Sequence, residues 1–262
     1  MRIRSLVAAA ASAGLVLAVG ASAVAAAAPT TLPAPVDYAY VRVLNAMTGQ
    51  PALDVYVTRV AVDTPPTYPA VKYGTWTAYQ KTYFTPDCTG KATCHLEFQV
   101  AVPGEAAAFK TDSLDFRAGG SYTVALASTG STGPNFIVIG EATSKPASSS
   151  LRFGNLTTDV TKTLDFSAVR MTKSAGPSSA TATDLAYAKI SVLRPVTAGP
   201  WNIQFRVHGS MGMAQPVKNA TLNGAQRYTA YAIGNLGGTD QYAAKFILVP
   251  GLTAVKATPI PR

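Results

Sequence analysis

The chain has 262 residues, with 22 lysine and arginine residues against 13 aspartate and glutamate residues, two cysteines and two histidines. The basic residues never form a run of three, which argues against a specific nucleic-acid site and indicates an ordinary solvated surface. Their excess could still favour an anionic polymer at a cell surface. The scarcity of histidine and cysteine argues against a metal centre.

Residues 1–28 have the pattern of a secretory signal peptide. Arg2 and Arg4 precede the short apolar run Leu6–Val19, and small residues through Ala28 offer Ala-x-Ala cleavage sites. The apolar run is shorter than the roughly 20 residues that span a bilayer. We therefore expect an exported protein, secreted or held at the cell surface, with no membrane span in the mature chain. An uncleaved membrane anchor is the alternative.

The mature chain shows the period-two alternation of β-strands and no convincing helical spacing. Its first stretch, Tyr40–Val57, predicts a β-hairpin with a loop at Met47–Pro51. A cluster of three prolines then predicts irregular structure up to Val71. Alternating apolar residues predict the next strands at Thr75–Phe84, Cys94–Val102, Leu114–Phe116 and Tyr122–Leu126.

A second copy of this pattern follows in the same order, which predicts an internal repeat. The matching segments are Val41-Arg42-Val43 with Leu151-Arg152-Phe153, Leu53-Asp54-Val55 with Leu164-Asp165-Phe166, and Tyr122-Thr123 with Tyr228-Thr229. We therefore predict two tandem domains at 37–143 and 151–255, joined by a linker at 144–150. Within the second domain, the small polar residues of Lys173–Asp184 predict a flexible loop.

Turn residues recur every eight to twelve positions or so, which is typical of a β-sandwich or barrel. Each repeat has the usual length of a seven-stranded sandwich and is long enough to bury a core of its own. The sequence therefore predicts an all-β protein made of two tandem sandwiches.

The two cysteines, Cys88 and Cys94, flank a predicted turn. Because export leads to an oxidising compartment, we expect them to form a disulfide that pins a hairpin. The second copy has no cysteines at this turn, so the bridge is a local brace and not a requirement of the fold.

The chain lacks the motifs of common catalytic and metal sites. His95 and His208 each lie near the end of a predicted strand, and we expect both on the surface. A carboxylate pair for catalysis could assemble from neighbouring aspartates, although such pairs are common. The candidate pairs are Asp112 with Asp115 and Asp54 with Asp63.

Aromatic residues are dense between Tyr68 and Phe84. Flat rings of Tyr73, Trp76 and Tyr79 at an edge of the sandwich could stack on sugars and form a ligand patch. The alternative is structural, with Trp76 inside the first core and Tyr79 packed on its rim.

Several segments together resemble a bacterial exported family known as domain of unknown function 4397. They are VRVLNAMTGQPALDVYV at Val41–Val57, VKYGTWTAY at Val71–Tyr79, AGGSYTVALA at Ala118–Ala127, LRFGNLTTDVTKTLDF at Leu151–Phe166 and QRYTAYAIGNLGG at Gln226–Gly238. The second copy departs from the pattern because it lacks an element like Tyr73-Gly74. The resemblance implies tandem immunoglobulin-like or transthyretin-like sandwiches outside the cell, and it implies no catalytic or binding residues.

From these observations we expect a non-catalytic protein of the cell envelope or the extracellular space, without a cofactor or metal. It would bind or support a cell-wall polymer or a surface protein. A carbohydrate-binding module that uses the aromatic patch near Trp76 is the alternative, and an enzyme with a carboxylate site is a third hypothesis.

Overall fold

A computed structural model describes residues 37–57, 65–88, 90–105, 107–128, 134–143, 146–172, 176–211 and 218–252. The predicted signal peptide at 1–28 and Asp63 lie outside these residues. The described elements are β-strands, apart from one turn of 3-10 helix (η1) at Pro86–Cys88, so the all-β prediction is confirmed. None of the described residues belongs to a helix with the length and hydropathy of a membrane span.

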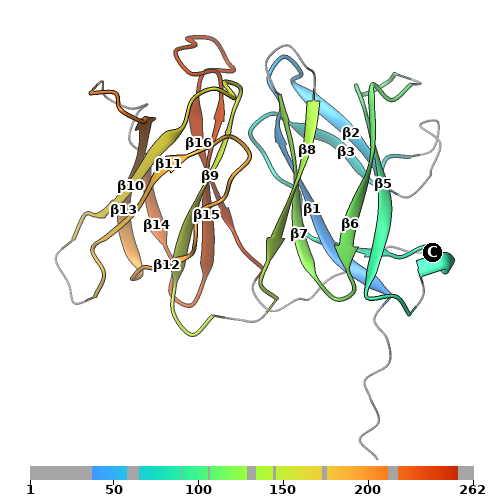
Figure 1. Ribbon diagram of the computed structural model, residues 1–262, viewed down its shortest axis with the longest axis horizontal. Coiled ribbons are helices and arrows are strands. Elements are labelled where there is room, and N and C mark those ends of the chain that lie inside the picture. Colours follow the sequence, from blue (N-terminus) through green and yellow to red (C-terminus); the bar gives the residue numbers. More distant parts are fainter. Residues whose placement is uncertain are drawn as a thin grey trace, which may run out of the picture. The chain divides into compact units, whose positions relative to one another are not determined.

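The first sandwich consists of two four-stranded sheets that face each other (Figure 1). One sheet has the order β4-β1-β7-β8, with strands Gln80–Tyr83, Tyr38–Ala46, Ser121–Ser128 and Pro134–Glu141. The facing sheet has the order β3-β2-β5-β6, with strands Tyr68–Lys72, Ala52–Val57, Thr93–Ala101 and Lys110–Arg117. β1 and β7 pair in parallel, whereas the other neighbours are antiparallel.

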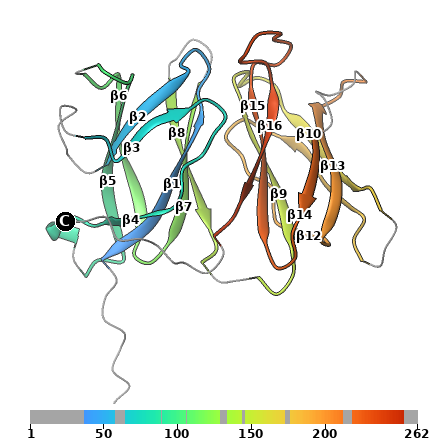
Figure 2. The same cartoon turned by 180° about the vertical axis from the view of Figure 1, so that it is seen from behind.

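The second sandwich has the same topology, strand for strand (Figure 2). Its first sheet has the order β12-β9-β15-β16, with strands Arg194–Pro195, Ser150–Thr157, Arg227–Gly234 and Lys245–Pro250. Its second sheet has the order β11-β10-β13-β14, with strands Ser179–Leu185, Leu164–Arg170, Gly199–Val207 and Lys218–Leu222. β9 and β15 form the parallel pair that corresponds to β1 and β7. The repeat read from the sequence is therefore also a repeat of strand order.

Polar anchors recur in both sandwiches at matching positions. Asn45 and Asn155 are fully buried, and the Nδ2 atom of each donates a hydrogen bond to a main-chain carbonyl at 2.9 Å. The hydroxyls of Tyr122 and Tyr228 accept the backbone N–H five residues earlier, at 2.9 and 2.8 Å. Because a buried polar group is costly unless it is hydrogen-bonded, the asparagines hold the carbonyls of β3 and β11 that they reach, and the tyrosines hold the turns that precede β7 and β15.

The predicted hairpin at Tyr40–Val57 is wrong. β1 pairs with β4 and β7, whereas β2 pairs with β3 and β5 in the facing sheet. The turn at Met47–Pro51 therefore carries the chain from one sheet to the other. Alternation could not distinguish the two arrangements, because a hairpin and a crossover both direct the same apolar residues into the core.

Two segments predicted to be irregular contain strands at sheet edges. β3 includes Pro69, and β11, at Ser179–Leu185, overlaps the loop predicted at Lys173–Asp184. A proline is tolerated at an edge because one side of an edge strand needs no ladder hydrogen bond. The strand expected at Thr75–Phe84 is shorter, at Gln80–Tyr83, and is preceded by an isolated bridge between Leu44 and Trp76.

Cys88 and Cys94 form the expected disulfide, although it does not pin a hairpin. Cys88 ends η1 and Cys94 lies in β5, so the bridge braces the connection by which the chain crosses from β4 in one sheet to β5 in the other. Both cysteines are buried in the first core.

Replacing both cysteines by serine should lower the free energy of unfolding by about 2 kcal/mol, because the unfolded chain gains the freedom of an opened loop. For a chain of this size that loss corresponds to a melting point lower by roughly 4–8 °C. Thermal unfolding followed by circular dichroism measures the shift. An identical melting point for the native protein with and without a reductant that opens the bridge would contradict the assignment.

Candidate functional site

Outer faces of the two sandwiches share a third apolar cluster, which we call the seam. It is separate from the two cores and joins the β1, β7 and β8 side of the first sandwich to the β9, β15 and β16 side of the second. Its buried members are Leu44, Ala46, Ala125, Ala127, Ile139, Leu156, Tyr231, Ile233, Ile247 and Val249. Strands β1, β7, β9 and β15 are therefore apolar on both faces.

Large and small residues have exchanged places between the two copies along the seam. Leu44 lies opposite Ala125 in the first sandwich, whereas Gly154 lies opposite Tyr231 in the second. A Cβ atom on Gly154 would lie 2.6 Å from the Tyr231 ring, so glycine is what makes room for the tyrosine. The seam is thus packed by complementary side chains and not by two identical faces.

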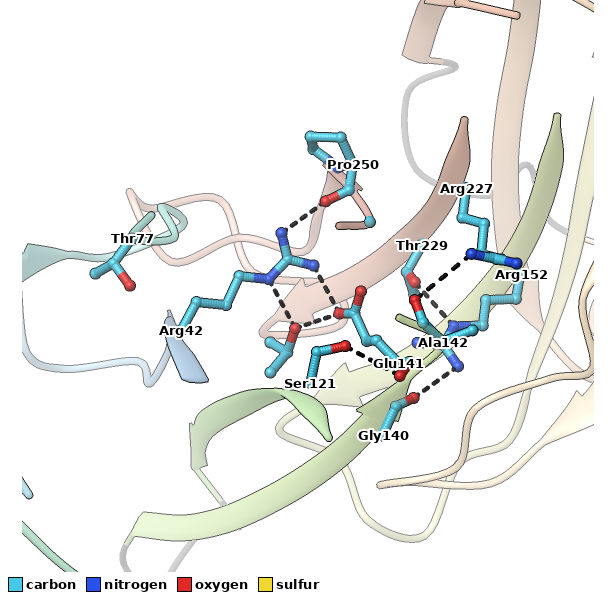
Figure 3. Close-up of polar contacts among 12 residues, drawn as sticks. Arg42, Thr77, Ser121, Gly140, Glu141, Ala142, Arg152, Arg227, Thr229 and Pro250 are labelled. Atoms are coloured by element: carbon cyan, nitrogen blue, oxygen red, sulfur yellow. Dashed lines mark hydrogen bonds and ion pairs between the residues drawn. The ribbon is translucent and has the colours of Figure 1, made fainter. Parts of the chain in front are cut away.

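A buried polar cluster lies beside these apolar residues (Figure 3). The Arg42 guanidinium contacts the Glu141 carboxylate, with Nη2 and Oε1 2.6 Å apart, and the two side chains are only 3% and 5% exposed. Arg42 also donates from Nε to Thr123 Oγ1 at 2.8 Å and from Nη1 to the Pro250 carbonyl at 2.6 Å. The Thr123 hydroxyl donates to Glu141 as well.

The second sandwich contributes the matching half of this cluster (Figure 3). Arg152 donates from Nε to Thr229 Oγ1 at 2.9 Å and from Nη1 to the Gly140 carbonyl at 3.3 Å. Arg227 donates from Nη1 to the Ala142 carbonyl at 3.5 Å. Arginines of each sandwich thus hydrogen-bond to the main chain of the other. We conclude that the cluster clamps the seam, because Arg42, Arg152 and Arg227 each donate a hydrogen bond across it to a main-chain carbonyl.

The three residues of the predicted aromatic patch do not share one exposed face. Tyr73 packs edge-on against Tyr242, with ring centroids 5.0 Å apart. The Tyr79 ring lies under the Arg42 guanidinium, 4.4 Å from its carbon, and burial raises the pKa of the Tyr79 hydroxyl. Trp76 is 37% exposed, so the alternative prediction that it fills the core is wrong. Trp76 lies in the connection between β3 and β4 and forms an isolated main-chain bridge with Leu44 of β1.

Both histidines lie on the surface, as predicted. His208 Nδ1 is 2.8 Å from Asp165 Oδ1, and Arg206 Nε is 3.3 Å from the other carboxylate oxygen. His95 Nδ1 pairs with Asp115 across β5 and β6. Both histidine side chains are at least half exposed. Hydrogen bonding to Asp165, and then the carboxylate charge, raise the pKa of His208 above its ordinary value of 6.5.

The aspartates proposed as catalytic pairs have separate partners. Asp112 lies 3.6 Å from the Lys110 ammonium, whereas Asp115 pairs with His95. Asp54 accepts the backbone N–H of Ala70 at 2.7 Å. Ala70 has a φ of 45°, so this carboxylate supports a strained backbone position. Within the described residues, no three His, Cys, Asp or Glu side chains gather as a metal site would require.

Charge is divided unequally between the two sandwiches. Residues 37–143 contain 9 acidic and 7 basic side chains, whereas residues 150–262 contain 4 acidic and 12 basic ones. The basic residues never form a run of three, whereas most of the acidic residues fall in the first sandwich. Counting acidic residues in each half would have revealed this feature from the sequence alone.

The second sandwich is also polarised from end to end. Its four carboxylates lie at the end where β9 and β15 finish; they are Asp159, Asp165, Asp184 and Asp240. The end where β9 and β15 begin carries Arg170, Arg194 and Arg227. Arg194 is exposed, on the two-residue edge strand β12. This arginine end is the described feature best suited to an anionic partner.

The substitution Glu141→Gln should lower the free energy of unfolding by about 3–5 kcal/mol, because it leaves the Arg42 guanidinium buried without its counter-ion. Chemical denaturation measures the loss. Asp112→Asn, which removes an exposed carboxylate from the same sandwich, serves as the control and should cost at most about 1 kcal/mol. Equal effects of the two substitutions would show that the buried pair does not hold the seam.

The substitution Asp165→Asn should lower the pKa of His208 toward 6.5, because it removes the carboxylate that stabilises the protonated ring. NMR titration of the histidine ring signals measures this change. Asp159→Asn at the same end of the sandwich is the control and should leave the titration of His208 nearly unchanged. A titration curve for His208 that is the same in Asp165→Asn and the native protein contradicts the assignment.

One family model matches the chain, and no curated protein does. The family is described as "Domain of unknown function (DUF4397)", and its model matches residues 39–167. The match begins in β1 and ends in β10, so it covers the first sandwich and the opening of the second. These residues include the Arg42 and Glu141 clamp and the disulfide. Over this segment, just under half of its length, the chain is similar to the DUF4397 family.

Proposed function

We propose that the chain is an exported, non-catalytic protein of the cell envelope whose second sandwich binds an anionic surface polymer. The observation that carries this proposal is the unequal division of charge, with 12 basic against 4 acidic residues in 150–262. A locally positive surface attracts a polyanion and raises its rate of association. The first sandwich, with 9 acidic and 7 basic residues, has no such excess.

The arginine end gives this charge a location. Arg194 is exposed at one end of the second sandwich, away from its four carboxylates, and lies at the same end as Arg170 and Arg227, which donate to the carbonyls of Ala198 and Ala142. Arginine presents a planar set of donors that matches phosphate and carboxylate groups. Repeated phosphate or carboxylate groups along a wall polymer are the ligand chemistry that fits this end.

A non-catalytic binding role agrees with the structural contacts that several ionisable side chains make. Arg42 and Glu141 take part in the cluster at the seam, and Asp54 holds the strained backbone of β3 at Ala70. Export is supported by the signal-like pattern of residues 1–28 and by the disulfide, which is typical of exported proteins. The resemblance to tandem immunoglobulin-like or transthyretin-like sandwiches supports the same role, because such domains commonly serve as binding modules.

The alternative, a carbohydrate-binding module built on Tyr73, Trp76 and Tyr79, has weaker support. Tyr73 packs against Tyr242, and Tyr79 packs against Arg42. Of the three residues, Trp76 alone is exposed. A single ring offers less stacking surface than the predicted patch.

The mature protein should co-sediment with purified cell envelopes at low salt and be released as salt rises, because ions screen surface charges within about 10 Å at 0.1 M. Arg194→Gln should weaken the binding about twofold to fivefold. Lys72→Gln removes one exposed charge from the first sandwich and is the matched control. Binding that persists at high salt, or that weakens equally in both variants, would rule out the arginine end as the binding surface.

A further inference from the structure

A second feature of the first sandwich, independent of the arginine end, is a polar hollow beside the disulfide. Its volume is about 330 Å³, at the small end of the range for ligand sites. Buried Cys88 and Leu96 belong to its wall. The described residues that line it are Thr85, Asp87, Cys88, Lys91, Thr93, His95, Leu96, Glu97 and Ser113.

The hollow exists because one connection is longer in the first copy than in the second. β4 ends at Tyr83 and β5 begins at Thr93, whereas β12 ends at Pro195 and β13 begins at Gly199. The longer connection folds into η1, and the disulfide ties it to β5. The first sandwich thus carries a covalently braced wall that its repeat lacks, although the two share every strand.

Side chains around the hollow supply both donors and acceptors. Asp87 and Glu97 are acceptors when ionised, Lys91 is a donor, and the threonine and serine hydroxyls are both. Asp115 pairs with His95 Nδ1, which leaves Nε2 as the ring atom for a further contact. Gln99 donates from Nε2 to Glu97 Oε1 at 2.7 Å and so restricts the Glu97 carboxylate.

We propose that this hollow binds a neutral saccharide. An anion would face the two carboxylates and a cation would face the Lys91 ammonium, whereas sugar hydroxyls can donate to the former and accept from the latter. Because the described lining residues include no phenylalanine, tyrosine or tryptophan, hydrogen bonds and not stacking on a large ring provide the recognition. The expected affinity is therefore weak, and the ligand is one or two sugar rings that fit the small volume.

Titration of the isotope-labelled mature protein with glucose, mannose and N-acetylglucosamine, followed by NMR, tests the proposal. At least one sugar should shift the backbone signals of His95, Glu97 and Ser113 and leave those of the second sandwich in place. Glu97→Gln should weaken binding roughly tenfold, because a charged acceptor forms stronger hydrogen bonds than an amide. Ser113→Ala, on the neighbouring strand β6, should weaken it to a smaller extent.

Glu105→Gln is the matched control, since it makes the same change in an exposed glutamate beyond the other end of β5. It should bind sugar like the native protein, and the dispersion of the amide spectrum verifies that each variant is folded. The proposal is overturned if none of the three sugars shifts these signals, if Glu97→Gln binds as well as the native protein, or if the signals respond to inorganic phosphate or calcium and not to sugar.

Discussion

The arrangement of the two sandwiches depends on the buried Arg42 guanidinium, which Glu141 of the same sandwich holds in place and which donates to the Pro250 carbonyl of the other sandwich. A buried arginine is tolerated only where its charge and its donors find partners. Arg42 contacts the Glu141 carboxylate and the Thr123 hydroxyl of its own sandwich and the Pro250 carbonyl of the other. That requirement defines where the end of β16 can lie. Arg152 repeats the contact in the reverse direction through the Gly140 carbonyl. Apolar side chains make up most of the seam, and these hydrogen bonds determine how the strands of one sandwich are placed against those of the other.

The seam explains why the functional hypotheses concern the remaining surfaces. It covers one face of each sandwich, and Tyr73 and Tyr79, two residues of the predicted ligand patch, are engaged beside it. What remains are the outer sheets, the strand edges and the ends. The two copies differ most at these places: the second has an excess of arginine at one end, and the first has a braced loop with a polar hollow. The two sandwiches thus share a strand order and differ at their surfaces.

Much of the fold could be predicted from the sequence, because alternation and turn residues are local signals. The repeat, the strands at β5 to β7 and the disulfide are examples. The crossover at Met47–Pro51 could not be predicted, since which strands pair depends on contacts that alternation does not encode. The seam does have a signal in the sequence. Tyr122–Ala127 and Tyr228–Ile233 are almost continuously apolar, as expected of strands buried on both faces. The exposure of Trp76 had no local signal.

Calorimetric unfolding of the mature protein tests most directly whether the seam makes the two sandwiches one unit. The shared apolar cluster and the buried ion pair predict a single cooperative transition, with a calorimetric enthalpy equal to the van't Hoff enthalpy. Two transitions, each with the enthalpy of one sandwich, would contradict the account. In that case the sandwiches would be independent domains, and the contacts between Arg42, Glu141 and Pro250 would not stabilise the folded protein.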